Sequence, residues 1–335
     1  MQTEVIAEIG NSHEGSLGVA KSFVDMAVDA GASVVKFQMH LAEFESSSSD
    51  EFRIKFSDQD KSRVEYWNRV AFTPEQWSIL SDYCEAKNTE FLCTPFSIEA
   101  AVILMESTSV NRWKVGSGDA VNFPLIDFLV ETGFPLIIST GLVSWEEVLK
   151  LKARLIGNGA WSRTTLMHCV SEYPTPLNRS ALNIIEDLKS LGCSVGLSDH
   201  SGSLSPSLLG IANGISVLEV HLTPHQSYFG PDVSSSLTPE QLKIVTQFSN
   251  DVATIKNNPK SRNDLFGDSE RTQKLFRKGL YWKMDMDKGS TVNISNLSFL
   301  KPSQDIDAIN YESVLGKKLK IHVAKGDVVK LEDFY

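Results

Sequence analysis

The chain has 335 residues, of which 41% are hydrophobic and 22% are charged, and its formal net charge is -10 at pH 7. This length exceeds that of a typical single domain, so we expect one large fold with a smaller appendage. The acidic balance argues against a nucleic-acid surface, because phosphate backbones attract clustered Lys and Arg, but it permits an anionic substrate in a local basic pocket. The sequence contains no apolar run of membrane-spanning or signal-peptide type, and its four cysteines show no metal-type spacing. These features predict a reduced, cytoplasmic protein that binds neither nucleic acid nor membrane.

Short β-branched runs alternate with helix-like stretches along residues 1–256. The predicted strands are Val5–Ile9, Ser33–Gln38, Thr89–Thr94, Arg112–Gly116, Pro135–Ser139, Thr164–His168, Cys193–Leu197 and Val217–His221. Helical periodicity predicts helices at Leu17–Ala30, Pro74–Lys87, Trp145–Leu155 and Pro239–Lys256. Near-continuous apolar strands are typical of a parallel sheet that is buried on both faces. Eight βα repeats therefore predict an α/β fold, a (β/α)8 TIM barrel, over residues 1–256.

Two segments depart from this alternation. Leu41–Arg69 is polar and includes the run SSSSD, so we predict a long insertion after the second strand, either a lid or a solvated loop. Residues 257–275 form a predicted linker, because Asn257–Gln273 lacks an apolar period. Residues 276–335 carry short strands, turn signals and one brief helical candidate near Asn310–Leu315. We expect them to form a small, mostly β second domain.

Nearly every predicted barrel strand ends in a polar residue. In a TIM barrel the active site lies at the carboxyl ends of the strands, so these residues should converge on one mouth. They are Glu8, Lys36, Gln38, His40, Thr94, Lys114, Ser117, Asp119, Ser139, Thr140, His168, Ser171, Tyr173, Ser198, His200, Glu219 and His221. Buried polar groups destabilise a fold unless they are paired, so a full ring of them indicates an enzyme site.

His200 and His221 follow consecutive strands and should be neighbours. Two imidazoles at a polar mouth suit a divalent metal such as Mn²⁺, Zn²⁺ or Mg²⁺, with water completing the coordination shell. A pair of hydrogen-bonded histidines without a metal would give the same sequence pattern.

The turn KVGSGD directly follows the fourth predicted strand. Gly116 and Gly118 allow the backbone to approach an anion, and Lys114 and Ser117 offer a charge and a hydroxyl group. The hydroxyl groups that would complete a phosphate cradle around Lys114 belong to Thr94, Ser171 and Ser198. A plain tight turn is the alternative interpretation of this motif.

Nine motifs in register make the chain resemble the sialic acid synthase family. They are IAEIGNSHEG, VVKFQ, CTPFS, KVGSGD, ISTGL, HCVSEYPTP, GLSDH, LEVHLT and FGPD. The resemblance extends to KGLYWKMDMDKGSTVNISNL and VLGKKLKIHVAKGD, which are similar to the antifreeze-like (SAF) domain of that family. It implies a SAF domain at 276–335 and a domain-swapped homodimer in which each small domain caps the partner's site.

The resemblance also implies a reaction, the condensation of phosphoenolpyruvate with an N-acylated hexosamine such as N-acetylmannosamine. The products would be a sialic-acid-type acid and phosphate, released by C–O cleavage. His200 and His221 would hold a divalent metal, Mn²⁺ by preference and otherwise Mg²⁺, Co²⁺ or Zn²⁺. The implied phosphoenolpyruvate contacts are Thr94, Lys114, Ser117, Ser139, Ser171 and Ser198. The implied sugar contacts are Glu8, Lys36, Gln38, Tyr173, Asp232 and Lys301. The implied catalytic residues are Glu8, Asp119, His200 and His221, with Asp119 handling protons at carbon 2 of phosphoenolpyruvate.

Several alternatives stay open at this point. Val220 and Lys301 stand where many family members have arginine, which leaves a legionaminic- or pseudaminic-type diacetamido-6-deoxyhexose as a second acceptor class. A barrel aldolase would instead form a Schiff base on Lys36 or Lys114. A degenerate barrel that only binds sugars or scaffolds a complex is a third alternative. Loss of the histidine pair or of the cradle would support it, and both are present. Scattered Lys and Asp in the tail argue against ice binding.

Overall fold

The structure is a computed structural model that describes residues 2–47 and 49–335. The chain divides into two compact units, the first ending at Asn257 and the second beginning at Asn258. No helix in the described part of the chain is both long enough and apolar enough to cross a bilayer.

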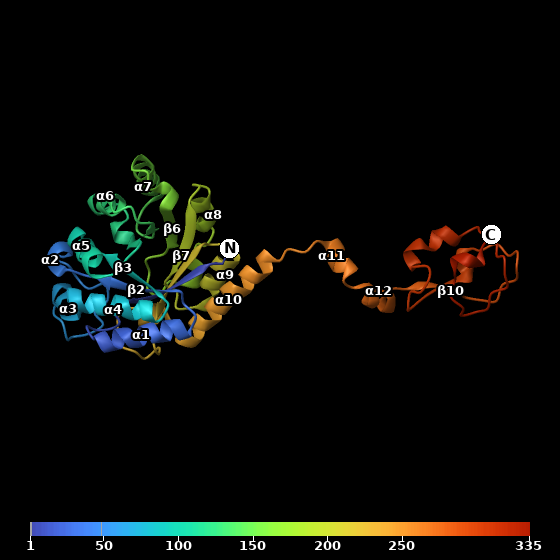
Figure 1. The fold of residues 1–335 in the computed structure, drawn as a ribbon, viewed down its shortest axis with the longest axis horizontal. Helices are drawn as coiled ribbons and strands as arrows, with labels where there is room; N and C mark the ends of the chain where they lie inside the picture. The colour runs from blue at the N-terminus through green and yellow to red at the C-terminus, as the bar shows by residue number, and fades with distance from the viewer. Residues whose placement is uncertain (1, 48) are drawn as a thin grey trace. The chain divides into compact units, whose positions relative to one another are not determined.

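The first unit is a barrel of eight parallel strands surrounded by helices (Figure 1). The strands are β1 (Glu4–Gly10), β2 (Val34–Met39), β3 (Glu90–Pro95), β4 (Trp113–Val115), β5 (Leu136–Ser139), β6 (Thr164–Cys169), β7 (Ser194–Asp199) and β8 (Val217–Leu222). They pair in the order β3-β2-β1-β8-β7-β6-β5-β4, with β4 next to β3 at the seam and the short β9 (Ser236–Leu237) beside β8. The predicted strands and the (β/α)8 TIM barrel are confirmed.

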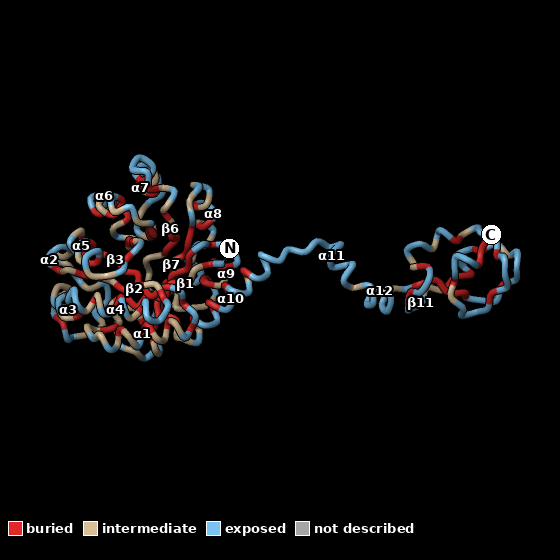
Figure 2. The backbone as a smooth tube through the Cα atoms, in the orientation of Figure 1, coloured by how far each residue is buried: buried red, intermediate tan, exposed pale blue. Residues whose placement is uncertain are grey.

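Helices cover the outside of the barrel. They are α1 (Leu17–Asp29), α4 (Pro74–Ala86), α5 (Ile98–Ser107), α6 (Phe123–Glu131), α7 (Trp145–Gly157), α8 (Ile184–Lys189), α9 (Leu204–Ala212) and α10 (Pro239–Asn257). Several begin at capping residues, because a side-chain oxygen there accepts an otherwise unpaired helix N–H group. Thr73 and Ser144, for example, form capping boxes that fix the starts of α4 and α7. The outer strand faces and the inner helix faces form the main apolar core, and Figure 2 shows the buried residues in red along the strands and on the helices around them.

The side chains that point into the barrel form two layers. The lower layer is an apolar cluster of Ile6, Val34, Leu92, Ile137, Met167 and Val217. Because successive side chains of a strand alternate between its faces, the residue two positions further along each strand points inward again. The upper layer is therefore polar on most strands and includes Glu8, Lys36, Thr94, Ser139, Cys169 and Glu219. The barrel thus has an apolar floor directly beneath its functional groups.

Gly196 on β7 stands where another side chain would enter the apolar floor. A Cβ atom there would lie 2.5 Å from the carbonyl oxygen of Val217 and would collide with Sδ of Met167. Glycine therefore allows β7 to pack in the barrel and brings Ser198, two residues later, into the polar layer.

The insertion between β2 and α4 is packed in part, and much of the stretch between its two helices is exposed. It contains the helices α2 (Ala42–Glu45) and α3 (Arg63–Val70). Its small core consists of Ala42, Tyr66, Trp67 and Val70, with Phe52, Phe56 and Val64 packed against it. Arg69 binds both carboxylate oxygens of Asp60 and forms a 2.9 Å ion pair with Glu14 in the loop after β1. This contact attaches the insertion to the barrel.

The predicted linker at residues 257–275 contains secondary structure that its sequence did not indicate. Two short helices lie there, α11 (Arg262–Gly267) and α12 (Glu270–Phe276). Ser261 and Asp264 form a capping box that starts α11. Neither helix buries a residue, so neither has the apolar period by which helices are recognised in a sequence.

The second unit contains an antiparallel pair of strands, β10 (Gly279–Trp282) and β11 (Leu297–Leu300), together with isolated bridges. Its separate apolar core includes Leu280, Trp282, Val292, Val314, Leu319 and Val329. The brief helix predicted near Asn310–Leu315 is a 3₁₀ helix, η6 (Ala308–Val314). The remaining 3₁₀ turns are η1 (Ser117–Asp119), η2 (Trp161–Arg163), η3 (Leu177–Arg179), η4 (Val233–Ser235), η5 (Ile294–Asn296) and η7 (Leu331–Asp333).

Candidate active site

A cavity of about 490 Å³ opens at the carboxyl ends of the barrel strands. The predicted site residues that line it are Glu8, Lys36, Gln38, Thr94, Lys114, Ser117, Ser139, Ser171, Tyr173, Ser198, His200, His221 and Asp232. Asp119 and Lys301 are not among the lining residues. Asp119 lies on η1 and accepts a 3.0 Å hydrogen bond from Asn122, so its proton-handling role stays a prediction.

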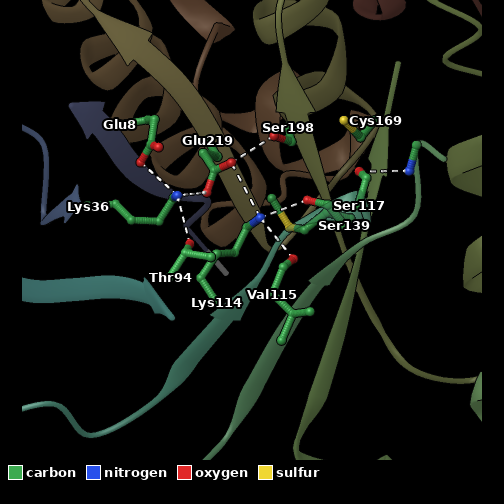
Figure 3. A network of polar contacts seen from close by, with 12 residues as sticks. Glu8, Lys36, Thr94, Lys114, Val115, Ser117, Ser139, Cys169, Ser198 and Glu219 are labelled. Carbon is green, nitrogen blue, oxygen red and sulfur yellow. Dashed lines mark hydrogen bonds and ion pairs between the residues drawn. The ribbon is translucent and has the colours of Figure 1, made fainter. Parts of the chain in front are cut away.

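Two lysines and two glutamates alternate at the bottom of this cavity (Figure 3). Lys36 Nζ lies 2.7 Å from Glu8 and 3.7 Å from Glu219, and Lys114 Nζ lies 3.5 Å from Glu219. Strand register causes this arrangement, because Glu8 on β1 lies level with Lys36 on β2 and with His221 on β8. All four charged side chains are buried, and their formal charges cancel.

Burial and pairing set the protonation of these groups. Burial opposes the charge of Lys36, but the carboxylates of Glu219 and Glu8 outweigh this effect, and the pKa of Lys36 is raised. Burial also opposes ionisation of Glu219, yet Lys114 and Lys36 hold its pKa well below the ordinary range. The pKa of Lys114 is lowered by burial and by the charge of Lys36. An anion bound beside Lys114 would therefore stabilise its ammonium form.

Hydroxyl groups surround these charges. The hydrogen bonds run from Lys36 Nζ to Thr94 Oγ1 (3.2 Å), from Lys114 Nζ to Ser139 Oγ (2.8 Å) and from Ser198 Oγ to Glu219 Oε1 (2.8 Å). Ser117 Oγ accepts a 3.0 Å bond from the backbone N–H of Gly141. A Cβ atom at Gly141 would lie 2.7 Å from Ser171 Oγ, so glycine leaves space for that hydroxyl group. The predicted cradle residues thus lie in one cavity, with Ser139 bonded to Lys114 and Thr94 bonded to the neighbouring Lys36.

His200 is held in a defined tautomer. Its Nδ1 lies 2.8 Å from the carbonyl oxygen of Val170, so Nδ1 carries the proton and donates it, which leaves the lone pair on Nε2. The Tyr173 hydroxyl lies 3.0 Å from that Nε2 atom. Burial, with the nearby ring of His221, lowers the pKa of His200 to about 3, so the imidazole is neutral at pH 7. The centroids of the two imidazole rings lie 5.4 Å apart.

This pair has the chemistry of a partial metal site. A neutral imidazole whose other nitrogen donates to a backbone carbonyl is the usual ligand form of histidine. In the described part of the chain, no third His, Cys, Asp or Glu completes a protein-only cluster. A cation bound here would therefore take its remaining ligands from water and substrate, as open catalytic sites do. The two histidines fit a divalent cation on these terms.

The roles of two residues in the site were not predicted from the sequence. Glu219 was noted as a strand-end residue and given no role, although its inward position two residues before His221 could have indicated one. Arg53 of the insertion also lines the cavity. Its guanidinium carbon lies 3.9 Å from the ring centroid of Tyr173, and its Nη2 lies 2.6 Å from Asp232. No local pattern predicts a contact between residues this far apart in the sequence.

Polar and ionised groups converge at the carboxyl end of the barrel, where barrel enzymes carry their active sites, so the chain falls in the class of (β/α)8-barrel enzymes. A comparison with family models narrows this class. The model of the NeuB family matches residues 23–260. The chain belongs to the NeuB family and is an enzyme of that type.

The relatives agree with this assignment. The chain is 31% identical over 325 residues to N,N′-diacetyllegionaminic acid synthase of Campylobacter jejuni subsp. jejuni serotype O:2, covering 94% of this chain and 95% of that protein. It is 32% identical over 246 residues to N-acetylneuraminate-9-phosphate synthase of Drosophila melanogaster, covering 72% of this chain and 66% of that protein. The solved structure of N-acetylneuraminic acid synthetase from Leptospira borgpetersenii serovar Hardjo-bovis in complex with citrate superposes with a TM-score of 0.70 and 26% identity, over 81% of this chain and 92% of that chain.

Proposed function

We propose that this enzyme condenses phosphoenolpyruvate with an N-acylated hexosamine to give a sialic-acid-type nonulosonic acid and phosphate. Carbon 3 of phosphoenolpyruvate attacks the aldehyde of the open-chain sugar, and the aldehyde oxygen takes up a proton to become a hydroxyl group. Water adds at carbon 2, and phosphate leaves with the bridging oxygen. The observation that carries the proposal is that Lys114, with a hydroxyl partner in Ser139, lines the same cavity as His200 and His221. Membership of the NeuB family supports it.

The cradle suits a small anionic molecule. Lys114, Thr94 and the surrounding serines offer an ammonium group and several hydroxyl donors in fixed positions. Glu8 accepts a 2.6 Å hydrogen bond from Gln38, which orients its carboxylate. In the proposal, Glu8, Gln38, Tyr173 and Asp232 bind the hydroxyl groups of the sugar above the anion.

His200 and His221 would hold a divalent cation, most suitably Mn²⁺, which when bound supplies Lewis acidity toward the acceptor carbonyl. The chain's own contribution is to fix the ligands before binding. The Val170 carbonyl keeps the proton on Nδ1 of His200 and holds the ring in one orientation, which leaves the lone pair on Nε2. The Tyr173 hydroxyl group lies 3.0 Å from Nε2 and would have to give up this contact when a cation binds there.

Bond cleavage tests this proposal. With ¹⁸O at the bridging oxygen of phosphoenolpyruvate, the label should appear in inorganic phosphate. Retention of the label in the keto acid would exclude the proposed water addition at carbon 2.

The metal is tested separately. Chelation should remove most turnover without unfolding the chain, and Mn²⁺ should restore the chelated enzyme. His200→Ala and His221→Ala should each remove most turnover and leave the chain folded. Full activity in chelator would exclude the metal.

A Schiff-base aldolase is the second candidate, because the lowered pKa of Lys114 would favour a reactive amine. Lys36 is a poorer candidate, since Glu8 and Glu219 keep it charged. Borohydride reduction in the presence of substrate should leave Lys114 unmodified under the proposed reaction. A substrate adduct on Lys114, found by mass spectrometry, would favour the aldolase instead.

A further inference from the structure

The insertion between β2 and α4 forms part of the cavity wall. Its residues that line the cavity are Phe52, Arg53, Ile54, Phe56, Arg63, Tyr66 and Trp67. They supply aromatic and aliphatic surface together with two guanidinium groups. None of them had a role in the sequence-based prediction, so what this wall recognises is a separate question from the chemistry at the barrel floor.

Arg53 is the residue of this wall that contacts the predicted sugar-binding side chains. It stacks over Tyr173, whose hydroxyl group bonds to His200, and it forms an ion pair with Asp232. A guanidinium group has five N–H donors in a rigid fork, and the bond to Asp232 uses one of them. The Arg53 side chain is 42% exposed, so donors remain available to a ligand in the cavity.

The charges of the wall are already balanced. Arg53 is paired with Asp232, and Arg63 is paired with Asp50 at 2.9 Å. A phosphate group at this wall would lie beside the Asp232 carboxylate and would compete with it for Arg53. A neutral carbonyl or hydroxyl oxygen could accept a free N–H group of Arg53 while the ion pair stays intact. Nearby Phe52 and Ile54 would then contact the apolar part of the same group.

We infer that Arg53 is a specificity-determining residue, which selects an acceptor sugar whose end at this wall is uncharged. The inference rests on the proposed condensation and extends it to the substrate class. The favoured acceptors are neutral N-acylhexosamines, including diacetamido-6-deoxy sugars, and the disfavoured class is the hexosamine 6-phosphates. Arg53 acts by donating to a neutral oxygen and by remaining bound to Asp232.

The role of Arg53 is tested by comparing three acceptor sugars in the natural enzyme and in matched variants. Phosphate release from phosphoenolpyruvate is measured with N-acetylmannosamine, N-acetylmannosamine 6-phosphate and 2,4-diacetamido-2,4,6-trideoxymannose. The best neutral sugar should exceed the 6-phosphate in kcat/KM by at least about tenfold, since a like-charge contact costs about as much as a lost charged hydrogen bond. Arg53→Met should lower kcat/KM for the neutral sugar roughly ten- to a hundredfold through its KM, with the KM of phosphoenolpyruvate unchanged.

Arg53→Lys should recover part of this loss, because it keeps the charge and loses the planar fork. Lys55→Met is the matched control, since Lys55 lies in the same segment, pairs with exposed Asp58 and does not line the cavity. Preference for the 6-phosphate, or an Arg53→Met enzyme that behaves like Lys55→Met, would overturn the inference and leave the condensation intact. No phosphate release with any of the three sugars would overturn the proposed function and this inference with it.

Discussion

His13 is a buried histidine that the active-site chemistry does not use. Its ring stacks on Phe72 with the ring centroids 4.3 Å apart, and its Nδ1 accepts a hydrogen bond from the N–H of Gly15. Burial, and to a lesser extent the charge of His40, lowers the pKa of His13 to about 3. The folded barrel therefore holds this imidazole in its neutral form across the physiological pH range.

Stability should depend on pH through His13. The unfolded chain binds a proton at this imidazole below its ordinary pKa of 6.5, whereas the folded chain does so near pH 3. The contribution of His13 to stability is therefore fully present above pH 6.5 and is lost as the pH falls toward 3. Replacing His13 by Phe should reduce the loss of unfolding free energy between pH 7 and pH 5 by about 2 kcal/mol, measured by denaturant titration. His225→Phe, at an exposed position of the same unit, is the control, and equal pH slopes in the two variants would contradict the prediction.

Glu219 balances the charges of Lys36 and Lys114 in the polar layer at the bottom of the cavity. Glu219→Gln should cost about 3–5 kcal/mol of unfolding free energy, because it leaves a buried ammonium without its counter-ion. Glu172→Gln breaks the ion pair with Arg179, in which the two side chains are 38% and 65% exposed, and should cost less than about 1 kcal/mol. Urea unfolding of both variants measures the difference. Similar losses of unfolding free energy in the two variants would show that the stability of the buried charge cluster does not depend on the Glu219 carboxylate.

At the scale of elements, the insertion should behave as a unit anchored by Arg69. Removing the bonds to Asp60 and Glu14 with Arg69→Met should accelerate amide exchange in α3 roughly ten- to a hundredfold, while β1 and β2 stay protected. Lys87→Met is the control, because it removes a more exposed ion pair, with Asp25, in which the two side chains are 40% and 42% exposed. Hydrogen-exchange mass spectrometry reads both segments. Faster exchange throughout the barrel would mean that Arg69 stabilises the whole unit instead.

The parts of the fold and of the site that could be predicted from the sequence are those marked by a regular spacing of apolar residues. The barrel strands were predictable because each is a short apolar run followed by a polar residue, which also located the cradle around Lys114. The helices α11 and α12 were missed, because they bury nothing and so carry no apolar period. Arg53 was missed for another reason, since its partner Asp232 is distant in sequence and the pairing depends on how the insertion folds.

At the scale of the whole molecule, the resemblance predicts a cap supplied by a second copy of the chain. We propose a homodimer in which the second unit, with Lys301, completes the partner's active site. A chain lacking residues 276–335 and a full-length His221→Ala chain should each be inactive alone. Mixed and allowed to exchange subunits, they should recover up to one working site per heterodimer. Complete exchange without recovered activity would show that the cap acts within its own chain, and an active truncated chain would show that it is dispensable.

The apolar floor of the barrel also has a kinetic consequence. Ile6, Leu92 and Met167 close the barrel beneath Lys114 and its serines, so a ligand in the cradle enters and leaves through the mouth. A sugar bound at Tyr173 and Asp232 would occupy that route. We therefore expect compulsory-order addition, with the deep anion first and the sugar second. Saturating sugar should slow the escape of trapped phosphoenolpyruvate in an isotope-trapping experiment, and escape at an unchanged rate would show a second exit.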